Sequence, residues 1–154
     1  MSFRETNIIV YGISMLVTSI GYAVVMSNMV DAGQFNGPDA MSLLGKSVLI
    51  LMGCAIVLTI ALVVLSTIIF TIRQKAKNGE NKQPKFELDE RDQMIELRVT
   101  RITEVITGLG YVVSMIALAM GQTPFVTINM IVASFMLGAI SGQVIKLFIY
   151  RRGY

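Results

Sequence analysis

The chain has 154 residues, of which 54% are hydrophobic and 15% charged, with a formal net charge of +3 at pH 7. It contains no histidine, no tryptophan and one cysteine, Cys54. Because histidine is the commonest zinc and haem ligand and the commonest general base near neutral pH, this composition excludes zinc metalloproteases and bis-imidazole haem proteins. A single cysteine also excludes a disulfide within the chain.

Apolar runs dominate the sequence, and there are four of them: residues 8–30, 47–72, 105–121 and 125–150. Each is close to the 17–25 residues that a helix needs to cross a hydrocarbon core about 30 Å thick. The runs predict an all-α integral membrane protein in which four transmembrane helices form two antiparallel hairpins. Residues 1–154 are then a single four-helix bundle domain, and Cys54 is expected to be buried among apolar neighbours.

Turn residues separate the runs. Gly37 and Pro38 predict a turn that starts the second helix. Between the third and fourth runs the connection is very short, and Thr123 is expected to cap the fourth helix with Pro124 at its first position. This tight reversal predicts an antiparallel pairing of the third and fourth helices.

Basic residues fall on one side of this four-pass arrangement, and among the 13 Lys and Arg only Lys46 lies by the other side. The positive-inside rule therefore predicts that both termini and the long central loop are cytoplasmic. No cleavable signal or organelle-targeting pattern is evident, so we expect a multi-pass protein of the cell inner (plasma) membrane. The basic residues serve orientation, and nothing further points to nucleic acid.

The central loop has two parts. Residues 73–88 are polar and basic and predict a flexible cytoplasmic linker, whereas residues 89–104 predict a charged amphipathic helix that continues unbroken into the third span. Apolar side chains recur in steps of four and three, as in packed helices, at Ile95, Val99, Ile102, Ile106 and Leu109. This seam either meets a second copy, with Arg91 and Glu96 exchanging ion pairs, or packs on the first or second helix or the bilayer surface.

The start of this helix carries a motif. Glu87-Leu88-Asp89-Glu90-Arg91-Asp92, then Ile95 and Arg98-Val99-Thr100-Arg101 before a span, resembles the Asp-Glu-Arg-Asp signature of small multi-span bacterial and archaeal membrane proteins of uncharacterised function. The resemblance implies a small multi-span protein without assigned catalytic residues.

We predict a partner-contact surface in this segment, made of Asp89, Glu90, Arg91, Asp92, Ile95, Glu96, Arg98, Val99 and Arg101. Three of its carboxylates share a helical face and could approach Mg²⁺ or Ca²⁺. The nearby arginines can neutralise them instead, and the glycine turn of a calcium loop is missing. We therefore expect no metal site and no cofactor.

Small and polar residues mark the spans. Five small residues are expected to pack helices closely, within the chain or against another subunit: Gly110, Ser114, Ser134, Gly138 and Gly142. Two further residues form a possible polar membrane site, Glu104, expected to pair with Arg101, and Asn129.

These features together favour a non-enzymatic regulatory or accessory subunit. Besides the lipid bilayer, its expected partner is a second copy, as a homo-oligomer, or another membrane or cytoplasmic protein. The alternative is a small transporter or channel formed by homo-oligomerisation, using Glu104 or Asn129. A membrane enzyme ranks third, since only dispersed Ser, Tyr and carboxylate side chains would serve it.

Overall fold

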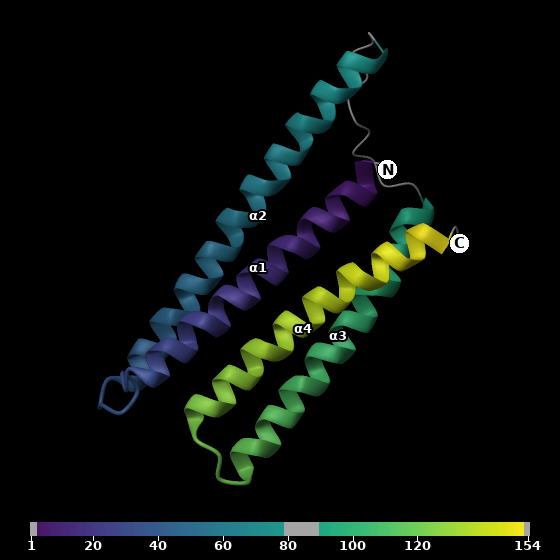
Figure 1. The fold of residues 1–154 in the computed structure, drawn as a ribbon. Coiled ribbons are helices and arrows are strands. Elements are labelled where there is room, and N and C mark those ends of the chain that lie inside the picture. The colour runs from purple at the N-terminus through teal and green to yellow at the C-terminus, as the bar shows by residue number, and fades with distance from the viewer. Residues whose placement is uncertain (1–2, 79–89, 153–154) are drawn as a thin grey trace.

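A computed structural model describes residues 3–78 and 90–152 and contains four helices (Figure 1). They are α1 (Phe3–Asp31), α2 (Ala40–Asn78), α3 (Glu90–Ala119) and α4 (Pro124–Arg152). All four are long and apolar enough to cross a membrane. The prediction of an all-helical protein is confirmed, and so is the prediction of four helices with the length and composition of membrane spans.

The charged ends of α2 and α3 extend the apolar runs. From Ile72 the next glycine or proline is Gly79, and α2 continues to Asn78, into the range predicted as linker. The rest of residues 73–88, and Asp89, lie outside the described residues. Beyond them, α3 runs unbroken from Glu90 to Ala119, with Glu90 and Asp92 in its first turn, where acidic groups complement the helix dipole.

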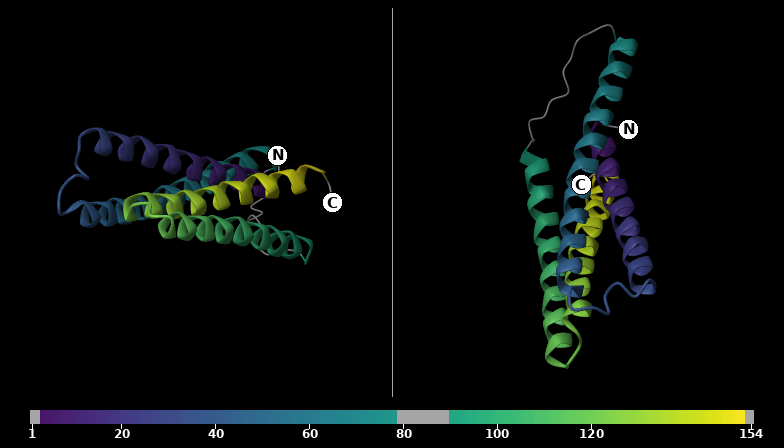
Figure 2. Two further views of the ribbon diagram at one scale, coloured as in Figure 1. Left: turned by 90° about the horizontal axis from the view of Figure 1, so that it is seen from below. Right: turned by 90° about the vertical axis from the view of Figure 1, so that its left-hand side faces the viewer.

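Seen as in Figure 1, the helices follow one another in the order α2, α1, α4, α3, and α2 also contacts α4. Figure 2 shows that they run along the length of the molecule. Neither α1 nor α2 contacts α3 within the described residues. The four-helix bundle that we expected is therefore open between α3 and the pair of α1 and α2 in the described residues. Large apolar side chains therefore stay exposed along the helices, and the buried hydrophobic residues are few: Ile8, Met26, Ala40, Leu44, Ile95 and Val99.

Polar side chains link α1 to both of its neighbours. Towards α2, the hydroxyls of Ser14 and Thr59 share a hydrogen bond of 2.8 Å, and Ser14 is fully buried. Towards α4, the Tyr22 hydroxyl donates to Oδ1 of Asn129 over 2.8 Å. Hydrogen bonds of this kind stabilise helix pairs where the surroundings offer no water.

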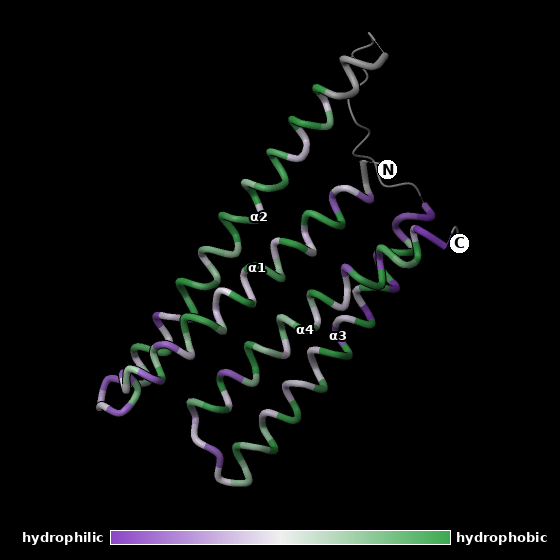
Figure 3. Tube along the Cα trace, in the orientation of Figure 1, coloured by the Kyte–Doolittle hydropathy of each residue, from purple (hydrophilic) through white to green (hydrophobic). Residues whose placement is uncertain are grey.

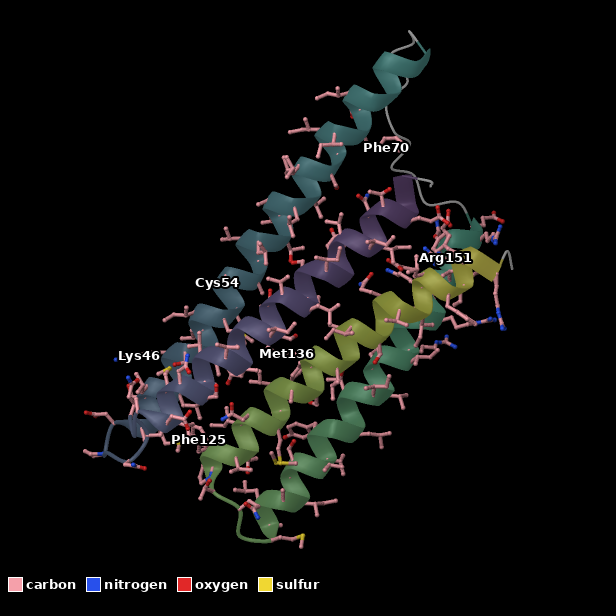
Figure 4. All side chains as sticks on the ribbon, viewed as in Figure 1. Lys46, Cys54, Phe70, Phe125, Met136 and Arg151 are labelled. Atoms are coloured by element: carbon pink, nitrogen blue, oxygen red, sulfur yellow. The ribbon has the colours of Figure 1, made fainter. Side chains whose placement is uncertain are left out.

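The two ends of the molecule differ in character. One end, which we name the charged end, carries the start of α1, the end of α2, the start of α3 and the end of α4 (Figure 1). Hydrophilic residues gather there on α3 and α4 (Figure 3). Its described basic residues include Arg91, Arg98, Arg101, Lys146, Arg151 and Arg152. Lys46 lies at the opposite end, close to the connection between α1 and α2 (Figure 4).

Both connections at the opposite end carry a glycine of positive φ as their second residue. Gly33 (φ 69°) follows α1 and Gly121 (φ 91°) follows α3, the left-handed conformation in which glycine ends a helix at little cost. On the far side of the second connection α4 begins at Pro124, and the Val126 amide donates to Oγ1 of Thr123 over 3.4 Å. The predicted cap and first residue of the fourth helix are thus confirmed.

Candidate functional site

In the described part of the chain, α3 packs against α4 and against no other helix. The two backbones approach closely where glycine faces a small or short side chain. A Cβ placed on Gly110 would overlap with the Cβ of Ser134, and one on Gly138 would overlap with Oγ1 of Thr107. These glycines are therefore required by the closeness of the two helices.

The same contact continues towards the charged end. A Cβ on Gly142 would lie 2.7 Å from Oγ1 of Thr103 and 3.5 Å from Cγ1 of Val99. In the other direction, Ser114 is fully buried and its hydroxyl donates to the carbonyl of Gly110 over 2.7 Å. The structure thus places the five small residues that we singled out where α3 meets α4 within one chain.

At the charged end, α3 and α4 are joined by a group that we name the polar clamp: Asp92, Glu96, Lys146 and Tyr150. The Tyr150 hydroxyl donates to Oδ1 of Asp92 over 2.5 Å, and Asp92 is only 7% exposed. One turn further along α3, Glu96 forms an ion pair with Nζ of Lys146. The acidic side of α3 therefore faces α4, which supplies the donors that charged oxygens need on burial.

The predicted apolar seam follows α4 only in part. Ile95 and Val99 are buried beside the polar clamp, whereas Ile102 is 38% exposed and Leu109 62% exposed. Where the seam is buried it contacts the fourth helix, and the first and second helices, one of the alternatives that we considered, do not reach α3 in the described residues. The seam leaves α4 because a heptad does not match the spacing of the glycines of α4. Gly138 and Gly142 are four residues apart, and so are Thr107 and Thr103, the residues of α3 that lie against them.

The opposite side of α3 is basic and apolar. Arg91, Arg98 and Arg101 are exposed there, and so are Met94 (68%) and Leu97 (62%). The structure gives these arginines no ion pair with a described carboxylate. Two carboxylates of α3, those of Asp92 and Glu96, are therefore bound by α4, whereas the three guanidinium groups face outward and Glu90 and Glu104 are exposed as well.

The possible polar membrane site is divided between two places. Asn129 accepts a hydrogen bond from Tyr22 and donates one to the carbonyl of Phe125 over 2.9 Å, so it links α1 to α4. Glu104 is exposed on α3, and its expected ion pair with Arg101 is not formed among the described residues. The structure does not bring Glu104 and Asn129 together.

Sequence reasoning missed the α4 half of the polar clamp. Asp92 and Glu96 are four residues apart on α3, and Lys146 and Tyr150 are four apart on α4. Two antiparallel helices with this spacing can match Asp92 to Tyr150 and Glu96 to Lys146 one turn apart. The shared spacing of acids and donors was the signal that could have identified the pairing.

Cys54 lies on α2 and is exposed (Figure 4). The prediction that its thiol is buried among the side chains of this chain was wrong, because α2 has α1 as its main neighbour and most of its surface stays open. Among the described residues, no three Cys, Asp or Glu side chains are grouped so that they could hold a metal ion.

No family model matches the chain, and no curated protein or solved structure shows significant similarity to it. The resemblance to small membrane proteins with an Asp-Glu-Arg-Asp motif therefore stays a prediction.

Proposed function

We propose that this protein is a non-enzymatic accessory or regulatory subunit of a cell inner (plasma) membrane. In this proposal its α3 helix projects from the membrane and binds a partner protein. The observation that carries the proposal is that α4 binds Asp92 and Glu96, while Met94, Leu97 and the arginines stay exposed on the opposite side of α3.

The length of α3 supports the projection. Its 30 residues span about 45 Å, whereas a hydrocarbon core is about 30 Å thick. The connection of α3 to α4 at Ala119 is short, so the excess of about ten residues falls at the charged end. In this placement α1 with α2, and α3 with α4, cross as two antiparallel hairpins. The positive-inside rule then puts the charged end and both termini in the cytoplasm.

The proposed partner surface is the run Arg91, Met94 and Leu97. These residues recur every three positions on the part of α3 that would project into water, on the side away from α4. Methionine and arginine are enriched where proteins meet, and two exposed apolar side chains between charges favour a contact. The surface suits a partner that offers a carboxylate beside an apolar patch.

Self-association through a parallel α3 dimer receives less support. That arrangement needs Glu96 as the acceptor for Arg91 of a second copy, but Glu96 already forms its ion pair with Lys146. Two copies that met through their outward sides would oppose arginine to arginine, which is unfavourable. We therefore favour a different protein as the partner.

The test is cross-linking in native membranes, followed by gentle extraction and mass spectrometry of the intact complex. A defined second protein should be recovered with the wild-type chain and lost with Arg91→Glu. A matched control is Arg152→Glu, because Arg152 also lies at the charged end but stacks over Phe148 on α4. Unchanged recovery with Arg91→Glu would overturn the proposed surface.

One observation favours the alternative, a small transporter or channel formed by homo-oligomerisation. Glu104 is an ionisable group at the edge of a span, on a side that none of the four described helices covers. Recovery of homo-oligomers alone would shift weight to this alternative. It predicts ion or substrate flux in proteoliposomes that Glu104→Gln abolishes.

A further inference from the structure

We propose that Arg98 and Arg101 hold the phosphate of an anionic phospholipid, whose acyl chain lies along the exposed side of α3 over Val105, Leu109 and Val112. This lipid site goes beyond the proposed partner surface, which ends at Leu97. It is a site for a headgroup and a chain together, not for a soluble anion.

The two arginines occupy the depth at which headgroups lie. Counting about 20 residues back from Ala119, the length that crosses the hydrocarbon core, ends near residue 100 of α3. Arg98 and Arg101 therefore lie on either side of this boundary, one helical turn apart and both exposed. A guanidinium group binds phosphate through two parallel hydrogen bonds, so the pair suits a headgroup in chemistry as well as position.

Below the arginines the same side of α3 is apolar and open. Val105 is 61% exposed, Leu109 62% and Val112 52%, and none of the described helices covers this side. From Arg101 to Val112 the helix rises about 16 Å, close to the roughly 15 Å of hydrocarbon in one leaflet. The arginines and the apolar track thus match an anionic lipid in both polarity and length.

A lipid fits this side better than a protein helix does. Helices associate in membranes through repeated small residues, as α3 and α4 do through Gly110, Gly138 and Gly142. On the opposite side of α3, Gly108 stands alone between Val105 and Val112, and a Cβ placed on it would meet nothing within 4 Å. A single glycine among branched side chains does not let two helix backbones approach closely, but such a surface accommodates a flexible acyl chain.

Charge also sets where the headgroup sits. Glu104 lies one turn deeper than Arg101 and is exposed on a neighbouring part of the helix surface. Its carboxylate repels a phosphate that moves deeper, so the favourable position is between Arg98 and Arg101. Asp92 and Glu96 do not compete for these arginines, because both face α4.

The absence of tryptophan from the chain makes a direct test possible. Val105→Trp introduces a single fluorophore at an exposed position beside the proposed acyl chain. The protein is reconstituted in phosphatidylcholine vesicles that contain a minor fraction of brominated phosphatidylglycerol or, separately, brominated phosphatidylcholine, and quenching is compared. Brominated chains quench only in contact, so the ratio reports which lipid occupies the site. Val112→Trp provides a second reporter on the same track.

We expect brominated phosphatidylglycerol to occupy the site with a preference of about fivefold for each arginine, and therefore on the order of 20-fold for both. Arg98→Gln with Arg101→Gln should abolish the preference, whereas Arg91→Gln, two turns further into water, should leave it within twofold. Excess inorganic phosphate should not displace the lipid. On α2, an Ile60→Trp reporter, at a 59% exposed position midway between Lys46 and Arg73, should show no preference.

Three results would overturn the proposal. Equal quenching by the two brominated lipids would show that the arginines select no headgroup. A preference that survives the double substitution would assign it to other residues. Absence of quenching by either lipid at positions 105 and 112 would show that a protein, such as a second copy, covers this side of α3.

Discussion

The helix pairs α3–α4 and α1–α2 use similar residues in different ways. In α3–α4, glycine lies where the backbones approach, and a Cβ on Gly110 or Gly138 would overlap with the neighbouring helix. In α1–α2, a Cβ on Gly21, Gly45 or Gly53 would meet nothing within 4 Å. The second pair is joined by side-chain hydrogen bonds instead, such as the one between Ser14 and Thr59.

The comparison shows that a glycine count does not identify a close helix contact. What distinguishes α3–α4 is the four-residue spacing of small residues on one side of α4, with short side chains opposite on α3. Close approach makes a contact that tolerates no added volume, whereas hydrogen bonds between longer side chains leave space. The two pairs should therefore respond differently to substitution.

The largest effect is expected for Gly110→Ala. The new Cβ would overlap with the Cβ of Ser134, which cannot rotate away because it is fixed to the backbone. We expect a loss of about 3 kcal/mol in the free energy of unfolding, the upper part of the range for overpacking. Denaturant titration in mixed micelles measures it.

The matched controls for this substitution lie close by. Gly108→Ala, on the open side of the same helix, should be neutral or stabilising by up to about 1 kcal/mol. Adding Ser134→Gly to Gly110→Ala should restore much of the loss, since it removes the overlapping atom. No recovery in the double variant would mean that the helices are not in contact at this level.

A smaller effect is expected at the polar clamp. Tyr150→Phe removes the hydroxyl that donates to Asp92, a carboxylate only 7% exposed. We expect a loss of about 2 kcal/mol, the range for a hydrogen bond to a charged group. Tyr111→Phe is the control, because Tyr111 is 50% exposed on the same helix pair. Equal stability of the two variants would contradict the clamp.

The seam of α3 offers a third comparison, between a buried and an exposed member. Val99→Ala should cost about 1 kcal/mol through lost packing against α4, since Val99 is 4% exposed. Leu109→Ala should cost less, although it removes more atoms, because Leu109 is 62% exposed. The reverse order in unfolding titrations would show that the heptad seam, and not the four-residue repeat, packs α3.

The smallest effect is expected for Ser14→Ala on α1. It removes the hydrogen bond to Thr59, and interhelical hydrogen bonds in membranes contribute about 0.6 kcal/mol. Ser19→Ala is the control, because the Ser19 hydroxyl donates only to the carbonyl of Met15 in its own helix. A loss as large as that of Gly110→Ala would erase the distinction between the two helix pairs.

The sequence was sufficient to predict the helices and insufficient to predict their order. Hydropathy locates each span because a helix in lipid must be apolar along its length. Which helix lies beside which depends on details such as the clash that Gly138 avoids with Thr107, and these carry almost no signal in composition. Cys54 illustrates the limit, because an apolar neighbourhood in sequence indicated burial, whereas its position on the outermost helix leaves it exposed.

The predicted partner surface stays a prediction, but the structure shows which of its residues are already engaged within the chain. Residues 89–104 were expected to contact a partner through both acidic and basic groups. The carboxylates of Asp92 and Glu96 are instead bound by Tyr150 and Lys146, because an antiparallel neighbour with matching spacing is nearer than any partner. The arginines face outward and remain the candidates.

The order of the helices also constrains how the chain assembles. In the described structure α3 touches only α4, and α1 has contacts with α2 and with α4. As helices leave the ribosome in order, α1 and α2 can pair early, but α3 must wait in the membrane without a neighbour until α4 follows. The helix made last thus contacts all three helices made before it, and a chain that stops before α4 leaves α3 without a neighbouring helix and exposed to quality control.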